Sequence, residues 1–391
     1  MEIPHEELLA YRDEFPILSR KVYLNSCSLG ALSMRVRHSV NAFMEEWAEW
    51  GASAWYKRWI GVMADTRREF ARLVNAEEHE VALLPSVSAA LASLATGLLP
   101  HFGERPEVVT TELDFPTVHY LWNAWAPQGV VTRTLPSNGV TVPLSAWEEA
   151  ITLTTAAAVT SHVFFTTGAI QDIRAIADIA HDNGALCIID AYQGTGQLPT
   201  DVRAMDVDVL MTGGLKWLLG GPGIVYLYVR EELIPQLEPL TTGWFANQYQ
   251  FEFDSERWGY AEDARRFESG TPPMESVFAG RAGLQIINEV GPQRIRERTR
   301  ALVTDFVERA QARGWDIRGA ELTPDERAGI VLVNVDDPAS ITAALKERDI
   351  IIDYRPGAIR YSTYFYNTVE ENTILLEALD ELLVRRNEPA A

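Results

Sequence analysis

Short apolar runs alternate with helix-like stretches along the chain from about residue 80 onward. Helices are expected near Ser86, near Phe115 and from Asp172 to Asn183. Apolar runs this short, placed between helices, are typical of buried, mostly parallel strands with crossover helices. The pattern therefore predicts an α/β domain with a mostly parallel mixed sheet flanked by helices. The expected strands are EVALLPS, EVVTTEL, VTSHVFFT, LCIID, VDVLMTGG and GIVYLYV.

The C-terminal part has a different pattern. A long helical stretch from Glu275 to Arg313 is expected to break near Gly291-Pro292. After it come the strand GIVLVNV, a helix over 340–347, short strands around Ile351 and Ile359, and a last helix from Val369. This mixture predicts a smaller α+β unit. The expected division is an N-terminal segment 1–20, a large domain 21–274 and a small C-terminal domain 275–391.

The amino-acid composition argues against some classes of binding partner. The 391 residues carry 34 basic and 55 acidic side chains, a formal charge of −21. This charge would repel nucleic acid and anionic membranes, so neither is expected as a partner. Only Cys27 and Cys187 are present, outside any CxxC pair, so we expect no disulfide framework and no metal site. The first residues lack a signal-peptide pattern and no apolar run is long enough to span a bilayer, so we expect a cytoplasmic protein.

Two residues at expected strand ends indicate the chemistry. Asp190 ends LCIID, and Lys216 follows VDVLMTGG, so both belong at the sheet edge where α/β proteins bind ligands. The chain has 30 arginines but only four lysines, and only a lysine can lose its proton on burial and act as a nucleophile. Taken singly, Lys216 could be a surface lysine and Asp190 a helix cap. Together they meet the needs of pyridoxal 5'-phosphate (PLP): a Schiff-base lysine and an acidic partner for the pyridinium nitrogen.

The cofactor would also need a phosphate site, a ring stack and a carboxylate clamp. Ser86-Val87-Ser88 opens an alanine-rich helix whose free N–H groups suit a phosphate, although a simple N-cap explains it as well. Phe115 lies after a strand and either covers a flat ring or packs in the core. Arg360 either binds a substrate carboxylate or forms a surface salt bridge.

The segments that contain these residues resemble those of a known enzyme family. The segment HDNGALCIIDAYQGTGQLPTDVRAMDVDVLMTGGLKWLLGGPGIVYLYV is similar to the core of class V, fold-type I PLP enzymes. The similarity extends from YLNSCSLG near the N-terminus to IIDYRPGAIRYSTYFYNT near the C-terminus. Within the class, kynureninase-like members resemble it most, through NSCSLG, DFPTVHY, GLKWLLGGPG, TGWFANQ, SGTPP and DYRPGAIR.

The resemblance implies a role for each matching residue. Lys216 would form the Schiff base, Asp190 would pair with the pyridinium nitrogen and Phe115 would stack on the ring. The implied cofactor contacts also include Val87, Ser88, Gln193, Trp244 and Thr271. Trp244 and Thr271 would lie near the phosphate and would come either from the same chain or from the other subunit of a dimer. The implied substrate contacts are Asn25 and Arg360. The family further implies a homodimer whose active sites lie at the interface.

Four positions depart from the kynureninase pattern. Kynureninases have aspartate, histidine, tyrosine and asparagine where this chain has Val118, Gln193, Leu215 and Thr271; glutamine at 193 is similar to the desulfurase branch. Cysteine desulfurases need a mobile cysteine in the C-terminal region, and residues 318–360 contain none. These differences weigh against both activities in the strict sense.

The functional prediction is an enzyme acting on the amino group of a small α-amino acid. The leading hypothesis is a lyase that breaks a Cβ–S or Cβ–C bond, with Lys216 removing the α-proton. Trp55, in the aromatic cluster of Trp55, Tyr56 and Trp59, is then expected to contact the substrate, although plain packing also explains such a cluster. An aminotransferase is the main alternative. Epimerisation and a non-catalytic PLP-fold protein are weaker ones.

Overall fold

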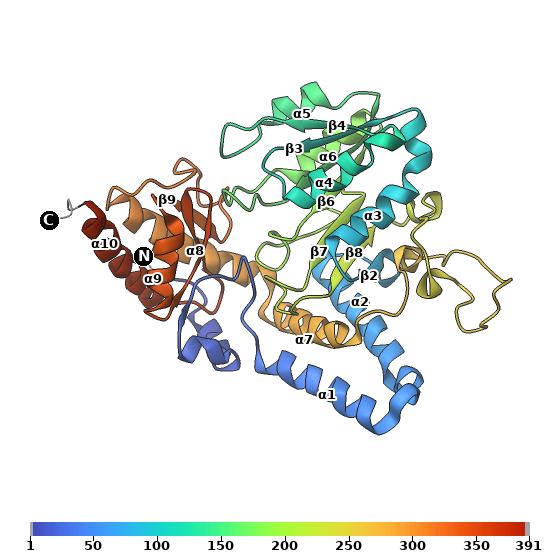
Figure 1. Ribbon diagram of the computed structural model, residues 1–391, viewed down its shortest axis with the longest axis horizontal. Helices are drawn as coiled ribbons and strands as arrows, with labels where there is room; N and C mark the ends of the chain where they lie inside the picture. Colours follow the sequence, from blue (N-terminus) through green and yellow to red (C-terminus); the bar gives the residue numbers. More distant parts are fainter. Residues whose placement is uncertain (1–2, 388–391) are drawn as a thin grey trace.

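The computed structural model describes residues 3–387, which form a large α/β part and a smaller C-terminal α+β part (Figure 1). The large part contains a seven-stranded sheet in the order β2-β8-β7-β6-β5-β3-β4. Its strands are β2 (Val81–Leu84), β3 (Glu107–Thr111), β4 (Val131–Leu135), β5 (Thr155–Ser161), β6 (Leu186–Asp190), β7 (Val209–Gly213) and β8 (Val225–Val229). All neighbouring pairs are parallel except those that β8 makes with β2 and β7. The predicted mostly parallel sheet is confirmed.

Helices cover this sheet because their apolar faces match the buried strands. The strands β5, β7 and β8 are buried along their whole length. The helices of the large part are α1 (Met34–Trp50), α2 (Ile60–Val74), α3 (Val87–Gly97), α4 (Pro116–Ala124), α5 (Leu144–Ala150), α6 (Ile173–Asp182) and α7 (Met274–Val290). Helix α7 packs against α1 and α2. This contact joins the first helices of the chain to the segment that follows the sheet.

The C-terminal part is built on a three-stranded antiparallel sheet with the order β11-β12-β9. Its elements are α8 (Pro292–Gln311), β9 (Ile330–Asn334), α9 (Pro338–Lys346), β10 (Ile350–Ile351), β11 (Asp353–Arg355), β12 (Ala358–Ser362) and α10 (Val369–Asn387). The part has its own core, in which the rings of Phe306 and Tyr361 stack with centroids 4.0 Å apart. The predicted helix break at Gly291 separates α7 from α8.

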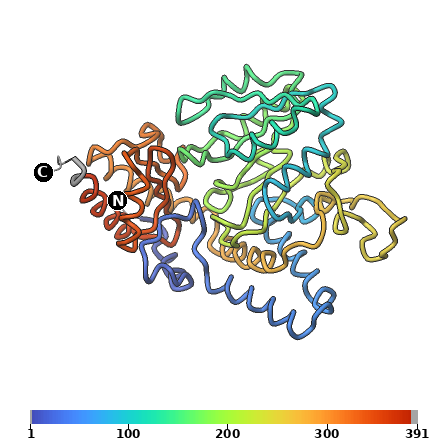
Figure 2. Tube along the Cα trace, in the orientation of Figure 1, coloured from blue at the N-terminus to red at the C-terminus, as the bar shows by residue number. Residues whose placement is uncertain are grey.

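Residues 22–25, near the start of the chain, pair with this smaller part. Strand β1 (Val22–Tyr23) pairs in parallel with β10, and Asn25 bridges to Ser362. Figure 2 shows the N-terminal trace lying beside the C-terminal elements. The contacts of β1 and of α7 therefore cross the boundary expected at residue 275, and the division into domains stays a prediction.

Candidate active site

Five strands of the large sheet end at one edge, and a cavity of about 340 Å³ lies there. Strand β2 leads to Pro85, β3 to Phe115, β5 to Ser161, β6 to Asp190 and β7 to Lys216. Because parallel strands bring their carboxyl ends together, polar residues far apart in sequence meet in this one place. The full lining is Pro85, Ser86, Val87, Ser88, Phe115, Thr117, Ser161, Val163, Phe165, Asp190, Tyr192, Gln193, Leu215, Lys216, Pro222 and Gly223.

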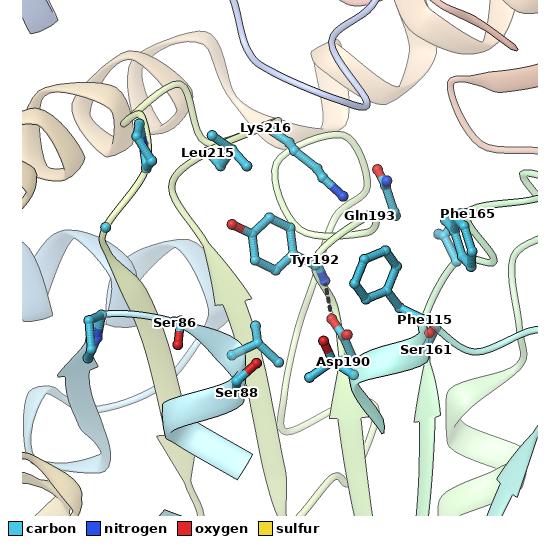
Figure 3. Close-up of a pocket in the computed structure, with 16 residues that line it drawn as sticks. Ser86, Ser88, Phe115, Ser161, Phe165, Asp190, Tyr192, Gln193, Leu215 and Lys216 are labelled. Atoms are coloured by element: carbon cyan, nitrogen blue, oxygen red, sulfur yellow. Dashed lines mark hydrogen bonds between the residues drawn. The ribbon is translucent and has the colours of Figure 1, made fainter. Parts of the chain in front are cut away.

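Lys216 directs its amino group into the middle of this cavity (Figure 3). The Nζ atom lies 4.7 Å from the ring centre of Tyr192 and 6.0 Å from that of Phe115. Burial lowers the pKa of Lys216 to about 8, because a charged amine is poorly solvated there. The charges of Cys27 and Asp190 oppose this shift, while those of Arg360 and Arg355 add to it. A sizeable fraction of this amine is therefore neutral and nucleophilic near neutral pH.

Asp190 is the second ionisable group of the cavity floor and is only 6% exposed. Burial raises the pKa of Asp190 to about 6, and the Tyr192 N–H, which donates to Oδ1 at 2.9 Å, opposes the rise. Lys216 also opposes the rise, and Asp114 adds to it. Since burial disfavours the carboxylate, this position is suited to a ligand that brings a positive charge or a proton to it.

The remaining walls supply an aromatic face, an oriented amide and a helix N-terminus. Phe115 precedes α4, is 44% exposed and meets the Phe165 ring edge-on with centroids 5.2 Å apart. The Gln193 amide is fixed at both ends: Trp217 Nε1 donates to its oxygen at 2.8 Å, and its nitrogen donates to the Cys27 carbonyl at 3.0 Å. One N–H of that nitrogen remains available to an oxygen in the cavity.

Helix α3 begins at the cavity wall. The Ser86 hydroxyl caps the helix by accepting the Ala89 N–H at 3.1 Å. The N–H groups of Val87 and Ser88 belong to the first turn and have no partner within the helix. Free amide groups and the helix dipole make this wall suitable for an anion such as a phosphate.

A family model described as aminotransferase class-V matches residues 23–375. The chain belongs to the class-V aminotransferase family. It is 37% identical over 96% of its length, and 97% of the other chain, to "Uncharacterized aminotransferase YcbU" of Bacillus subtilis. It is 29% identical over 94% of its length to a kynureninase of Shouchella clausii, of which it covers 90%. An apo cysteine desulfurase structure from Thermococcus onnurineus has a TM-score of 0.88 at 23% identity, covering 98% of each chain.

Membership in the class-V family makes this chain a PLP-dependent enzyme of fold type I, as the sequence predicted. The residues of the cavity fit that cofactor. A lysine amine with a lowered pKa, a buried carboxylate, an aromatic ring and a helix N-terminus all face one space. PLP supplies an electron sink that takes up the charge released at a substrate α-carbon.

Six of the eleven residues predicted for the site of this class-V enzyme line the cavity. They are Val87, Ser88, Phe115, Asp190, Gln193 and Lys216. Arg360 lies just behind the lining, 1% exposed, and donates to the Phe165 carbonyl at 3.3 Å. Its guanidinium also contacts Asp353 at 2.7 Å and the Ser28 hydroxyl at 2.6 Å, while its Nε has no partner among residues 3–387. Arg360 thus forms an ion pair, as the alternative prediction had it, but the pair is buried and not at the surface.

Four predicted residues lie outside the cavity lining. Asn25 is at the bridge to Ser362, and Trp55 packs against Trp59 and Phe245 with centroids 5.1 Å and 6.0 Å away. Trp244 is partly exposed, with its indole N–H donating to the Gln250 carbonyl, and Thr271 is exposed. The roles assigned to these four residues stay predictions.

Ten lining residues were not among the predicted site residues, and Ser161, Phe165 and Tyr192 are three of them. Ser161 lies opposite Asp190 where β5 and β6 pair. A polar residue at the end of the strand beside β6 could therefore have been predicted as part of the site. Tyr192 lies between two predicted residues, and a large aromatic side chain at that point could also have been noted. In the part of the chain that the structure describes, no group of three ligating side chains could hold a metal ion. None of its helices is long and apolar enough to cross a membrane.

Proposed function

We propose that this class-V enzyme is a lyase that cleaves the side chain of a β-substituted amino acid at a Cβ–S or Cβ–C bond. The observation that carries the proposal is the Lys216 amine, buried beside Asp190 with a pKa of about 8. Once substrate has displaced it from the cofactor, this amine is a base of suitable strength to take the α-proton. With the charge held by the bound cofactor, loss of that proton would let a sulfur substituent leave Cβ with its bonding electrons. A Cβ–C bond would instead break after water adds to the carbonyl carbon next to Cβ, and its bonding electrons would stay on Cβ.

The lining of the cavity supports a substrate with an uncharged side chain. Val163, Phe165 and Pro222 contribute apolar surface, and we assign this wall to the leaving group. Arg360 is assigned to the substrate carboxylate, because its buried Nε has no partner in the described chain and Asp353 holds the guanidinium beside Phe165. An arginine clamp of this kind fixes the α-carbon relative to Lys216.

A persulfide-forming desulfurase is not supported, because neither cysteine lies on an exposed loop. Cys187 is within β6, where burial raises the pKa of its thiol well above the ordinary range. Cys27 is also buried, and its carbonyl accepts the Gln193 amide. A thiol must reach the substrate as a thiolate to act as the sulfur acceptor.

An aminotransferase remains the second candidate, since the relative from Bacillus subtilis carries that description. The two reactions differ in their products. A Cβ–S lyase converts an S-substituted cysteine and water to a thiol, pyruvate and ammonia, whereas an aminotransferase needs a keto acid to receive the amino group. We expect S-substituted cysteines or kynurenine to be consumed without any keto acid, with ammonia and thiol, or alanine and anthranilate, as products. Turnover that depends strictly on an added keto acid would contradict the lyase.

We further propose that two copies of the chain form a homodimer that works in the cytoplasm. Several large apolar side chains on the loop after β8 are exposed, among them Trp244, Phe253 and Trp258. This loop projects from the body of the molecule (Figure 2). Trp244 and Thr271 lie outside the cavity of their own chain, as expected of residues that serve the partner's site. Sedimentation equilibrium tests the dimer, which a monomer mass at working concentration would contradict.

A further inference from the structure

Tyr192 extends across the cavity between Asp190 and the loop that carries Lys216. Its N–H donates to Asp190, and its ring centre lies 4.7 Å from Lys216 Nζ. In Figure 3 its hydroxyl points away from Phe115 toward the side of the cavity where Leu215 and Ser86 lie. Since the side chain is anchored at its backbone and stretched along the wall, the phenol oxygen has a defined position.

Gly213 makes room for this side chain. A Cβ atom at Gly213, the last residue of β7, would collide with the ring and the hydroxyl of Tyr192. The absence of a side chain at 213 therefore lets the phenol lie directly against the end of β7. The hydroxyl occupies the space on this wall that a side chain at position 213 would otherwise fill.

The hydroxyl is in a state to donate a hydrogen bond. It accepts a hydrogen bond from the Leu215 backbone N–H, while burial and the charge of Asp190 raise the pKa of Tyr192 to about 12. The phenol therefore keeps its proton at neutral pH. No residue among 3–387 accepts that proton, and the side chain lines the cavity. A ligand oxygen on this side of the cavity would be its acceptor.

We propose that the Tyr192 hydroxyl donates a hydrogen bond to the phosphate of PLP and closes the phosphate site from the β7 side. The free N–H groups of Val87 and Ser88 at the start of α3 form the opposite side. The Leu215 side chain has no donor, so the phenol supplies the hydrogen bond that this wall otherwise lacks. The inference rests on the cofactor and on the phosphate position assigned to α3.

The test uses Tyr192→Phe, which keeps the ring and removes only the hydroxyl. Hydrogen bonds to charged groups are among the stronger ones, so we expect the Kd for PLP, measured by equilibrium dialysis with cofactor-free protein, to rise about 10-fold. Binding of pyridoxal, which lacks the phosphate, should change less than about 2-fold by the same reasoning. The ³¹P NMR signal of bound PLP should also shift. Tyr120→Phe, at a side chain 72% exposed on α4, is the matched control.

Each outcome has a separate meaning. An unchanged Kd for PLP in Tyr192→Phe would overturn the inference, and so would an equal loss of affinity for PLP and pyridoxal, which would assign the hydroxyl to another part of the cofactor. Failure of the wild-type protein to bind PLP at all would contradict the cofactor itself rather than Tyr192. Near-ultraviolet circular dichroism of the cofactor-free variant checks that its packing is unaltered.

Discussion

Replacing Lys216 with alanine is expected to lower turnover by at least about 1000-fold, since a positioned base alone contributes up to about 10⁴-fold. The chain has three other lysines, Lys21, Lys57 and Lys346, and none of them lines the cavity. No other amine of the described cavity lining can therefore attach the cofactor or take the α-proton. The measurement is the initial rate of product formation at saturating PLP.

Two controls separate chemistry from folding in this experiment. Lys346→Ala, at an exposed position on α9, should keep full activity. Added methylamine should restore part of the rate of Lys216→Ala, because a small amine can enter the space left by the side chain and act as the base. Activity of Lys216→Ala close to wild type would refute the assigned role.

Asp190→Asn is expected to have opposite effects on activity and on stability. The carboxylate keeps the pyridinium nitrogen protonated, so its loss should reduce kcat by about 100-fold to 1000-fold, the range found when one preorganised electrostatic group is removed. In cofactor-free protein, however, burial raises the pKa of Asp190 from 3.8 to about 6, so the ionised carboxylate destabilises the fold at pH 8. The asparagine variant should then be more stable by on the order of 3 kcal/mol.

The sign of the pH dependence follows from linkage. A group whose pKa is higher in the folded than in the unfolded protein favours folding at pH values below both pKa values, and this contribution is lost as the pH rises through about 6. The advantage of Asp190→Asn should therefore be full at pH 8 and smaller at pH 5. Urea unfolding of the cofactor-free proteins at both pH values measures it. An equal advantage at both would show that ionisation of Asp190 is not its source.

The strands that carry the site were predictable because they are buried on both faces and read as continuous apolar runs. LCIID and VDVLMTGG became β6 and β7, and their ends brought Asp190 and Lys216 together. Strand β4, with the sequence VTRTL, was missed because it is at the sheet edge and mostly polar and exposed. Its local pattern resembles that of a loop, and only pairing with β3 makes it a strand.

Some parts of the site depend on how strands pair and how distant segments pack, and these were not predictable from the sequence. Asp353 and Arg360 are neighbours because β11 and β12 pair in one register, and Ser28 reaches both from the N-terminal segment. The orientation of Tyr192 depends on the absence of a side chain at Gly213, the last residue of the next strand, β7. A pattern of residue types identifies candidate groups, but the direction of each side chain follows from its neighbours in space.

Borohydride reduction followed by peptide mapping tests most directly whether PLP is attached to Lys216. The reduction fixes the cofactor to whichever amine holds it, and mass spectrometry of a protease digest then identifies the modified residue. We expect a single phosphopyridoxyl group, on the peptide that contains Gly214, Leu215 and Lys216. A label on Lys21, Lys57 or Lys346, or no label after incubation with PLP, would contradict the account.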